Sequence, residues 1–324
     1  MPFDEPTGAS SFAESMTSGA MWLRLEQLCQ QSPRMKALRW MLDREGQISW
    51  LHTLGVLEDD QLMSMVPPFP PYWLRAISSH PELAGFLLSG AGDAQLMMEL
   101  YREHASPPVD SPAILDFGCG AGRLLRFVLL SSARGELHGC DVNPAFVHWC
   151  QASLIGAQSR LISGDPPTSY ASGTFDLIYA LSVFTHLPEP RAKAWMTELT
   201  RLLSPGGVLV MTTHGPEALE VARANDEIRE LLLLQPEDIA RTQRALGTTG
   251  VIFRPYPKDL IERAQVGAAY GITLVHPDHL RAHWRVRGLT LAAYVPGGKP
   301  RWQDVVVWRR RPARKTVSRP LTRV

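Results

Sequence analysis

Three glycines stand at alternate positions in the segment DFGCGAG (116–122). Glycine has no Cβ, so the backbone of such a loop can approach a ligand closely. The apolar run ILDF (114–117) before the loop predicts a strand, and GRLLRFVLL (122–130) after it predicts a helix. Because the first N–H groups of a helix have no intrahelical partner, they favour polar or anionic ligand groups. The segment therefore predicts a ligand-binding loop between a strand and a helix.

A carboxylate, Asp141, ends the next predicted strand, GELHGCDV (135–142). An acid at this place in a strand–helix–strand unit is suited to binding the two hydroxyl groups of a ribose. Because the carboxyl ends of parallel strands meet at one edge of a sheet, the glycine loop and Asp141 are expected to lie together. The two features predict a nucleoside-bearing cofactor at that edge.

The spacing of the glycines discriminates between cofactors. The dinucleotide fingerprint is G-x-G-x-x-G, whereas this chain has G-x-G-x-G with Asp116 two residues before the first glycine. A carboxylate so close to the loop would repel a pyrophosphate but would suit a cationic aminoacyl group. The pattern favours S-adenosylmethionine over NAD. An NAD-dependent oxidoreductase is the alternative from another class, and tight binding of NAD would favour it.

Strands and helices alternate through the middle of the chain, which predicts a parallel, doubly wound α/β sheet with right-handed crossovers. Two later strands, 289–298 and 302–310, are joined by a turn rich in Pro, Gly and Lys and predict an antiparallel hairpin at the sheet edge. The expected fold is thus Rossmann-like and mostly parallel with an antiparallel C-terminal hairpin. The remaining predicted strands are 114–117, 135–142, 160–165, 175–183 and 208–214, and the helices between them are 122–130, 144–154 and 190–203.

With these motifs the chain resembles class I S-adenosylmethionine-dependent methyltransferases, of the broad type found in small-molecule and glycan-modifying enzymes. The resemblance covers about residues 110–215 and 276–310 and says little about the methyl acceptor. The stretches that carry it are DFGCGAGR, HGCDVNP, SGDPPTSYASGTFDLIYALSVFTHLPE, WMTELTRLLSPGGVLVMTTHG and VPGGKPRWQDVVVWRR.

The resemblance implies S-adenosylmethionine as the cofactor and gives a role to each residue of the glycine loop. It implies that Gly118, Gly120 and Gly122 lie under the methionyl part, and that Asp116 holds the amino group.

The resemblance also assigns the nucleoside end of the cofactor. Asp141 is implied to bind the ribose hydroxyls, and Val142 and Asn143 to lie beside the adenine. Asp165 is implied to accept a hydrogen bond from the adenine amino group.

Methyl transfer from a sulfonium is an in-line displacement that depends mainly on positioning in a dry site, and a hydroxyl acceptor also needs a base. The resemblance implies that Leu181 and Ser182 line the methyl-transfer face. His186 follows the fourth strand and His214 ends the fifth, so both are candidate catalytic bases at the carboxyl edge. His214 is slightly favoured because it opens a long insertion. The alternative for each is a structural histidine.

The chain divides into four predicted parts. Residues 1–110 form a helical N-terminal cap, in which Asp93 is expected to cap a helix. Residues 111–310 form the Rossmann-like methyltransferase domain with a helical lid insertion at 216–275, and 311–324 form a basic disordered tail. Two lids over one site favour a small-molecule acceptor, such as a natural product or a sugar, methylated on a hydroxyl or an amine. A glycan or lipid chain is the alternative acceptor, and a non-catalytic binding protein is a third class.

Charge argues against a nucleic-acid partner. The formal net charge is +1, but residues 309–323 hold seven Lys or Arg and no acid, so the first 308 residues carry about −6. The segment Asp165-Pro166-Pro167-Thr168 resembles the motif of amino-directed DNA methyltransferases, but it follows the third strand and lacks the stacking aromatic residue.

Four cysteines without a CxxC pair suit a reducing compartment. No signal peptide and no apolar run of roughly 18 residues is found, so no membrane span is predicted and a cytoplasmic location is expected. His276, His279 and His283 have helical spacing, but we interpret them as a polar helix face and predict no metal. The sequence leaves the oligomeric state open.

Overall fold

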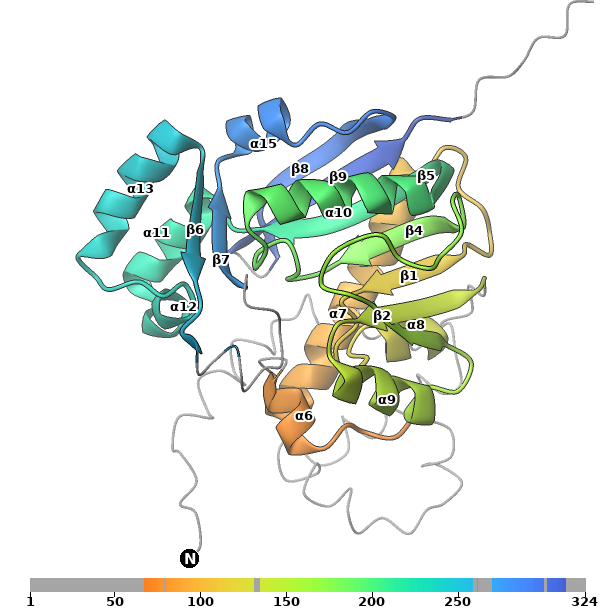
Figure 1. The fold of residues 1–324 in the computed structure, drawn as a ribbon. Helices are drawn as coiled ribbons and strands as arrows, with labels where there is room; N and C mark the ends of the chain where they lie inside the picture. The colour runs from red at the N-terminus through yellow and green to blue at the C-terminus, as the bar shows by residue number, and fades with distance from the viewer. Residues whose placement is uncertain are drawn as a thin grey trace, which may run out of the picture.

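The computed structural model describes residues 67–77, 80–130, 135–258, 261, 270–299 and 302–312. The predictions for residues 1–66 and for the tail after 312 lie outside these residues. The described part is built around one large sheet with helices on both faces (Figure 1).

The large sheet has seven strands in the order β3-β2-β1-β4-β5-β9-β8. The first five in the chain pair in parallel, while β9 is antiparallel to both β5 and β8. This confirms the predicted fold class, including the antiparallel C-terminal hairpin. The strands are β1 (Ile114–Phe117), β2 (Leu137–Asp141), β3 (Gln158–Leu161), β4 (Phe175–Ala180), β5 (Leu203–Thr213), β8 (Leu289–Lys299) and β9 (Gln303–Arg310).

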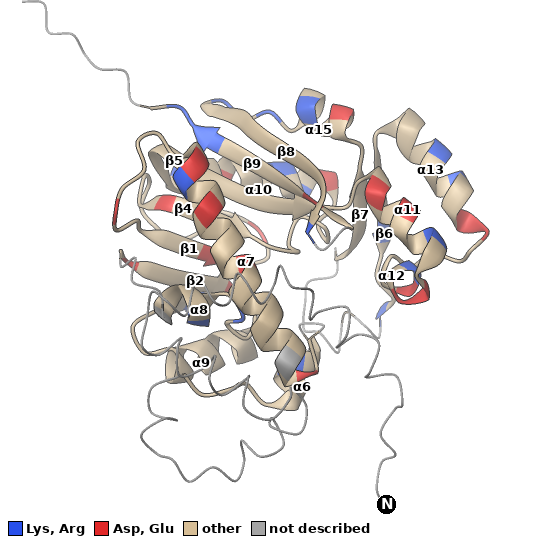
Figure 2. Ribbon diagram, turned by 180° about the vertical axis from the view of Figure 1, so that it is seen from behind, with Lys and Arg blue, Asp and Glu red and all other residues tan. Residues whose placement is uncertain are grey.

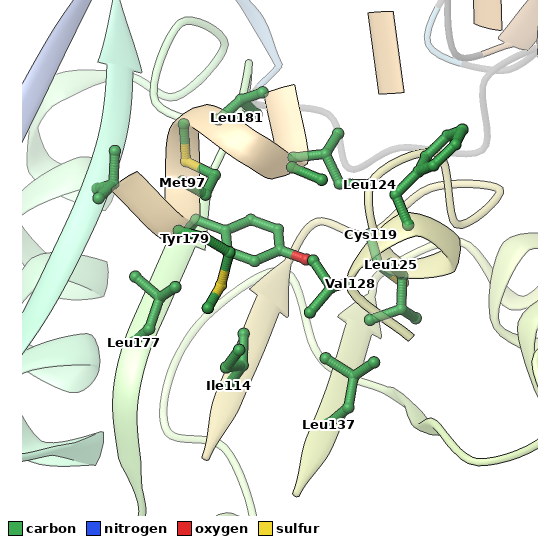
Figure 3. Packing of buried hydrophobic residues seen from close by; sticks show 14 of the residues in the cluster. Met97, Ile114, Cys119, Leu124, Leu125, Val128, Leu137, Leu177, Tyr179 and Leu181 are labelled. Atoms are coloured by element: carbon green, nitrogen blue, oxygen red, sulfur yellow. The ribbon is translucent and has the colours of Figure 1, made fainter. Parts of the chain in front are cut away.

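Alternate residues of the central strands enter two separate cores, because successive side chains of a strand point to opposite faces. One core lies against α7 (Leu83–His104), α8 (Leu125–Leu130) and α9 (Pro144–Ser153). Figure 3 shows part of it, with Tyr179 of β4 among side chains from α7 and α8. The other core lies against α10 (Glu189–Leu202) and α15 (Pro277–His283). The sheet is therefore buried on both faces, as parallel sheets usually are.

Between β5 and α15 the chain forms a smaller unit with its own core. Its helices are α11 (Pro216–Ala224), α12 (Asp226–Leu231) and α13 (Asp238–Thr249), where helices were predicted. It also holds β6 (Val251–Pro255) and β7 (Gly271–Val275), which pair in antiparallel fashion and were not predicted.

β7 attaches this unit to the large sheet. Its amides at Gly271, Thr273 and Val275 donate to the carbonyl oxygens of His186 (3.1 Å), Thr185 (2.8 Å) and His214 (2.8 Å). The hairpin therefore binds directly to the segments that follow β4 and β5.

α7 is a helix of 22 residues that follows the short α6 (Tyr72–Ile77). It begins at Leu83, so the prediction that Asp93 caps a helix is wrong: Asp93 lies inside α7 and is buried. Among the described residues, no helix has the length and apolar character that a membrane span needs.

Candidate functional site

The glycine loop adopts a conformation that requires its glycines. Gly118, Gly120 and Gly122 have φ angles of +79°, +52° and +77°, in the left-handed region that other residues rarely adopt. A Cβ on Gly118 would lie 2.4 Å from Cγ2 of Val183, in the segment after β4. A Cβ on Gly122 would likewise lie 2.4 Å from Cδ1 of Leu154, so the loop leaves no room for side chains at Gly118 and Gly122.

Asp141 lies at the end of β2 and is tied to this loop. Its Oδ2 accepts from the amide of Gly120 (2.9 Å), and its Oδ1 accepts from the amide of Asn143 (2.8 Å). Burial raises the pKa of Asp141, and these amides act in the opposite direction. Asn143 in turn caps α9 by accepting from the amide of Ala145 (2.9 Å). The structure therefore brings the predicted ribose residue and the predicted glycine loop together.

Asp116, at the carboxyl end of β1, is a buried acid with an unsatisfied oxygen. Its Oδ2 has no hydrogen-bond partner in the described part of the chain. Burial raises the pKa of Asp116 to about 8, although Arg123 and Tyr179 act to lower it. A cationic ligand group beside Oδ2 would satisfy this atom and favour its ionised form. The site therefore fits the ammonium group of an aminoacyl ligand.

A cluster of three buried charges lies beside Asp116. Both Arg123 and Lys299 contact Oδ2 of Asp93, the latter with its Nζ at 2.9 Å. Burial lowers the pKa of Lys299 to about 8, while Asp93 raises it. Two cations share one carboxylate here, and the charge of Arg123 also acts to lower the pKa of Asp116. The surplus positive charge suits a ligand carboxylate, so Asp116 and this cluster together are complementary to a zwitterionic amino-acid group.

The sequence analysis missed this charge cluster. Asp93 was interpreted as a helix cap, and Lys299 as part of a turn. The one available signal was Arg123, which follows directly after the glycine loop in DFGCGAGR.

The other predicted cofactor residues lie around the ends of β2, β3 and β4. Ser182 has a φ angle of +54°, its amide donates to Oγ1 of Thr212 (2.8 Å), and its hydroxyl donates to Oε1 of Gln303 (3.1 Å). Leu181 is buried and Val142 is half-buried.

Asp165 differs from the other predicted cofactor residues. Its side chain is 65% exposed, and its carboxylate pairs with Nε of Arg191 on α10 (2.8 Å). The structure connects it to α10 rather than to the glycine loop.

The two predicted catalytic histidines lie next to each other, with the edge of one ring toward the face of the other. The ring centroids of His186 and His214 are 6.5 Å apart, with the ring planes at 83°. His214 is 1% exposed, and neither of its ring nitrogens has a hydrogen-bond partner in the described residues. Burial, with a contribution from His186, lowers the pKa of His214 to about 3. Its imidazole is therefore neutral at pH 7.

His186 has partners that His214 lacks. Its Nδ1 lies 3.0 Å from the carbonyl oxygen of Gly271 and 2.9 Å from the hydroxyl of Tyr256. Burial lowers the pKa of His186, and the carbonyl of Gly271 acts to raise it.

Aromatic rings that the sequence analysis did not single out surround the two histidines. Trp302 stacks on His214 with centroids 4.9 Å apart, and Tyr270 stacks on His186 with centroids 6.3 Å apart. Tyr256 completes the group at 5.8 Å from His186. These rings come from the segments around β6, β7 and the start of β9, which are far from β4 in the sequence. No local pattern could have indicated them.

The histidines of α15 do not form a metal site. Nε2 of His279 lies 2.7 Å from Oε1 of Glu189, and the rings of His279 and His283 are 4.5 Å apart. In the described ranges, no group of three or more His, Cys, Asp or Glu side chains could hold a metal ion.

Comparison with known proteins identifies the class of this domain. Residues 115–209 match the family described as "Methyltransferase domain". The match confirms the predicted resemblance: the chain carries a class I methyltransferase domain, and S-adenosylmethionine is the cofactor of this class.

Curated relatives of this chain are named as O-methyltransferases. A malonyl-[acyl-carrier protein] O-methyltransferase of Paenibacillus sp. is 28% identical over 151 residues, which is 44% of this chain and 54% of that protein. A fatty-acid O-methyltransferase of Mycolicibacterium smegmatis is 26% identical over 121 residues, 37% of this chain and 43% of that protein. The chain thus spans about half the length of the curated relatives it matches.

Among solved structures, the chain is similar to an S-adenosylmethionine-dependent methyltransferase from Mesorhizobium loti. It is 15% identical, with a TM-score of 0.43, and the match covers 68% of this chain and 98% of that one.

Proposed function

We propose that this chain transfers a methyl group from S-adenosylmethionine to a hydroxyl group of a small, flat acceptor. The observation that carries the proposal is the pair of neighbouring histidines after β4 and at the end of β5, at the sheet edge that also bears the glycine loop. The names of the curated relatives, all O-methyltransferases, support oxygen as the methylated atom.

Residues at the other strand ends are proposed to hold the cofactor. Asp116 pairs with its ammonium group, and the cluster of Arg123 and Lys299 with its carboxylate. Asp141 binds the ribose hydroxyls. When bound, S-adenosylmethionine supplies a methyl group already activated by a sulfonium. The protein therefore needs only to position the acceptor, exclude water and remove the acceptor proton.

The adenine is proposed to lie at the end of β2, beside Val142 and Asn143. Arg191 contacts both oxygens of Asp165, with Nε 2.8 Å from Oδ1 and a second nitrogen 3.3 Å from Oδ2. Because a carboxylate oxygen can accept more than one hydrogen bond, Asp165 is proposed to accept also from the adenine amino group. Leu181 and Ser182 are proposed to line the face across which the methyl group moves, and Ser182 is hydrogen-bonded to Thr212 of β5 and to Gln303 of β9.

His186 is the better base of the two histidines. The carbonyl oxygen of Gly271 can only accept, whereas the hydroxyl of Tyr256, 2.9 Å from the same Nδ1, can donate or accept. We assign the hydrogen to Nδ1, with both oxygens accepting from it, which leaves the lone pair of Nε2 to take the acceptor proton. The same carbonyl stabilises the positive charge that then forms. Neither ring nitrogen of His214 has a hydrogen-bond partner in the described residues. The backbone of Thr273 acts to raise the pKa of His214, but burial and His186 outweigh it, and a pKa of about 3 makes His214 a poor base at pH 7. We assign His214 to binding the acceptor as a neutral donor and acceptor.

The surroundings of the histidines indicate the type of acceptor. Tyr256, Tyr270 and Trp302 contribute flat, mostly apolar rings on both sides of the histidine pair. Such rings stack on a flat ligand and contribute no formal charge. An aromatic alcohol fits this arrangement better than a sugar.

The cofactor site is tested first, by calorimetric titration of S-adenosylmethionine, its demethylated product and NAD. Losing charged hydrogen bonds in Asp141→Ala should weaken binding of the sulfonium cofactor about 10- to 150-fold. The exposed Glu136→Ala serves as the control. Binding of NAD alone, or an unchanged affinity in Asp141→Ala, would contradict the site.

The histidines are tested by methyl transfer to catechol, a hexose and a long-chain fatty acid. We expect catechol to be the best acceptor. His186→Gln should lower kcat about 10²- to 10⁴-fold, while His214→Asn should mainly raise KM. His148→Gln, on the exposed side of α9, is the control. Full kcat in His186→Gln, or transfer only to the fatty acid, would refute this assignment.

A further inference from the structure

A cavity lies at the end of the sheet that is opposite to the histidines. It has a volume of about 540 Å³ and lies between the turn that joins α15 to β8 and the end of β9. On β5 and β9, Thr213 pairs with Asp304 near the histidines, whereas Val208 pairs with Arg309 near this cavity. Cationic residues gather at this end of the molecule, on the last residues of β9 and on the segment before β8 (Figure 2). The cavity is therefore separate from the cofactor and acceptor sites.

The wall of this cavity is rich in arginine and contains no acid. It includes Arg281, Arg285, Arg287 and Arg311. Of these, Arg281 pairs with the exposed Asp278 (3.1 Å), whereas Arg285, Arg287 and Arg311 have no carboxylate partner in the described part of the chain. Arginine stays protonated at any physiological pH, so the wall carries a permanent positive charge. We call this cavity the arginine pocket.

The floor of the arginine pocket has an unsatisfied donor of its own. Trp308 lines it, is 3% exposed, and its indole N–H has no acceptor among the described residues. A buried N–H without an acceptor is costly, and native structures seldom leave one unpaired. That nitrogen is closed to solvent, so a ligand in the pocket would contact the ring of Trp308 and not its N–H. The guanidinium groups of the wall are the donors that a ligand rich in acceptor oxygens would satisfy.

The remaining lining is apolar and comes from Val286, Leu289 and Leu291. The volume falls within the range of about 300–1,000 Å³ that is typical of small-molecule sites. We propose that the arginine pocket binds a small amphipathic anion, with a carboxylate or phosphate head at the arginines and an apolar body on Trp308 and Leu289. The chain's own C-terminal segment is not a suitable occupant, because residues 309–323 carry seven Lys or Arg and no acid.

Octyl phosphate and octanoate are the probes, and they distinguish a phosphate head from a carboxylate head. 1-Octanol has the same apolar chain without charge, and inorganic phosphate has the charge without the chain. Binding to the full chain is measured by calorimetry, with and without saturating S-adenosylmethionine. We expect one or both amphipathic anions to bind at least tenfold more tightly than octanol and inorganic phosphate, and the bound cofactor to leave this affinity unchanged.

Variants locate the binding. Because each lost charged hydrogen bond weakens binding about tenfold or more, the double variant Arg285→Gln/Arg287→Gln should weaken it at least tenfold. Both side chains are exposed, so the fold should be unaffected. Trp308→Phe leaves a smaller apolar floor and should weaken binding about two- to tenfold. Arg241→Gln, on the exposed side of α13, is the matched control.

Four results would overturn the proposal. They are equal binding of octanol and the anions, tighter binding of inorganic phosphate than of either amphipathic anion, unchanged affinity in the double arginine variant, and displacement of the probe by S-adenosylmethionine. The last result would place the probe in the cofactor site.

Discussion

The raised pKa of Asp116 makes cofactor binding depend on pH in a direction that can be worked out. With a pKa of about 8, the carboxyl group is about 9% ionised at pH 7 in the free protein. If the ligand ammonium pairs with the ionised form, Asp116 releases about 0.9 proton at pH 7. An α-amino group with a pKa of roughly 7.7–8.0 takes up about 0.1–0.2 proton, so the net release is about 0.7–0.8 proton. The apparent affinity is then lower than that of the fully ionised protein by about tenfold, or about 1.4 kcal/mol.

Between pH 6 and pH 8 the affinity for S-adenosylmethionine should therefore rise, by about tenfold per pH unit at the lower end. Above pH 8 the rise should stop, because an α-amino group with a pKa of roughly 7.7–8.0 loses its own proton there. Calorimetry in two buffers of different ionisation enthalpy measures the released proton directly. Asp116→Asn should bind with no pH dependence over pH 6–7.5 and release no proton.

At pH 7 the loss of affinity in Asp116→Asn should be small. Removing a charged hydrogen bond costs about 1.5–3 kcal/mol, but the variant also avoids the ionisation cost of about 1.4 kcal/mol. The exposed Asp110→Asn is the control. An affinity that is constant from pH 6 to pH 8 in the unmodified protein, or an equal slope in Asp116→Asn, would refute the reasoning.

Three further predictions concern stability, each measured by urea unfolding. Gly118→Ala should cost about 1–3 kcal/mol, since its φ is +79° and a Cβ would meet a side-chain methyl group at 2.4 Å, whereas Gly164→Ala, with open space around it, should cost little. Asp93→Asn leaves two buried cations without their anion and should cost about 3–5 kcal/mol. Lys299→Met should lower the stability less than Asp93→Asn does, because Asp93 keeps its contact with Arg123. A larger loss in Lys299→Met than in Asp93→Asn would contradict the central role of Asp93 in this cluster. Burial raises the pKa of Glu198, but hydrogen bonds from an arginine and a threonine outweigh this and hold the pKa at about 2. Because that pKa is depressed, the unmodified protein should have a higher free energy of unfolding than Glu198→Gln. This difference should have its full size above pH 4.5 and should shrink as the pH falls toward 2.

The sequence predicts the large sheet well because its signals are local. The strands β1, β4 and β5 contain apolar runs, and the glycine loop lies within a few residues of Asp116 and of α8. β3 ends earlier than predicted, at Leu161 rather than at residue 165. The next segment contains Gly164, Pro166 and Pro167, and proline has no N–H to donate to a sheet.

α7 shows why a local pattern can mislead. Asp93 precedes a run with helical spacing and therefore resembles a cap, yet the helix starts ten residues before it, at Leu83. Glycines at 85, 90 and 92 lower the helix propensity of its first half. Tertiary packing requires at least one of them, because a Cβ on Gly90 would lie 2.5 Å from the carbonyl oxygen of Arg123. The contact that fixes this glycine is invisible in the sequence.

The acceptor side of the site was predicted only in part, because its contacts are long-range. His186 and His214 were identified from their places at strand ends. The β6–β7 hairpin was not, since five-residue apolar runs fit a buried helix and a strand equally well. The rings from this region and from Trp302 reach the histidines only through the folded chain.

The attachment of β7 sets an order in which the site can form during synthesis. The parallel strands and the glycine loop are complete once residue 213 has left the ribosome. The carbonyl groups of Thr185, His186 and His214 still lack their partners, which are the amides at 271–275. At about 5–20 residues per second, these amides arrive about 3–12 seconds later. A nascent chain that stalls after residue 213 and before residue 271 has left the ribosome should already have its glycine loop formed. The segments that carry His186 and His214 should still lack their hydrogen bonds from β7.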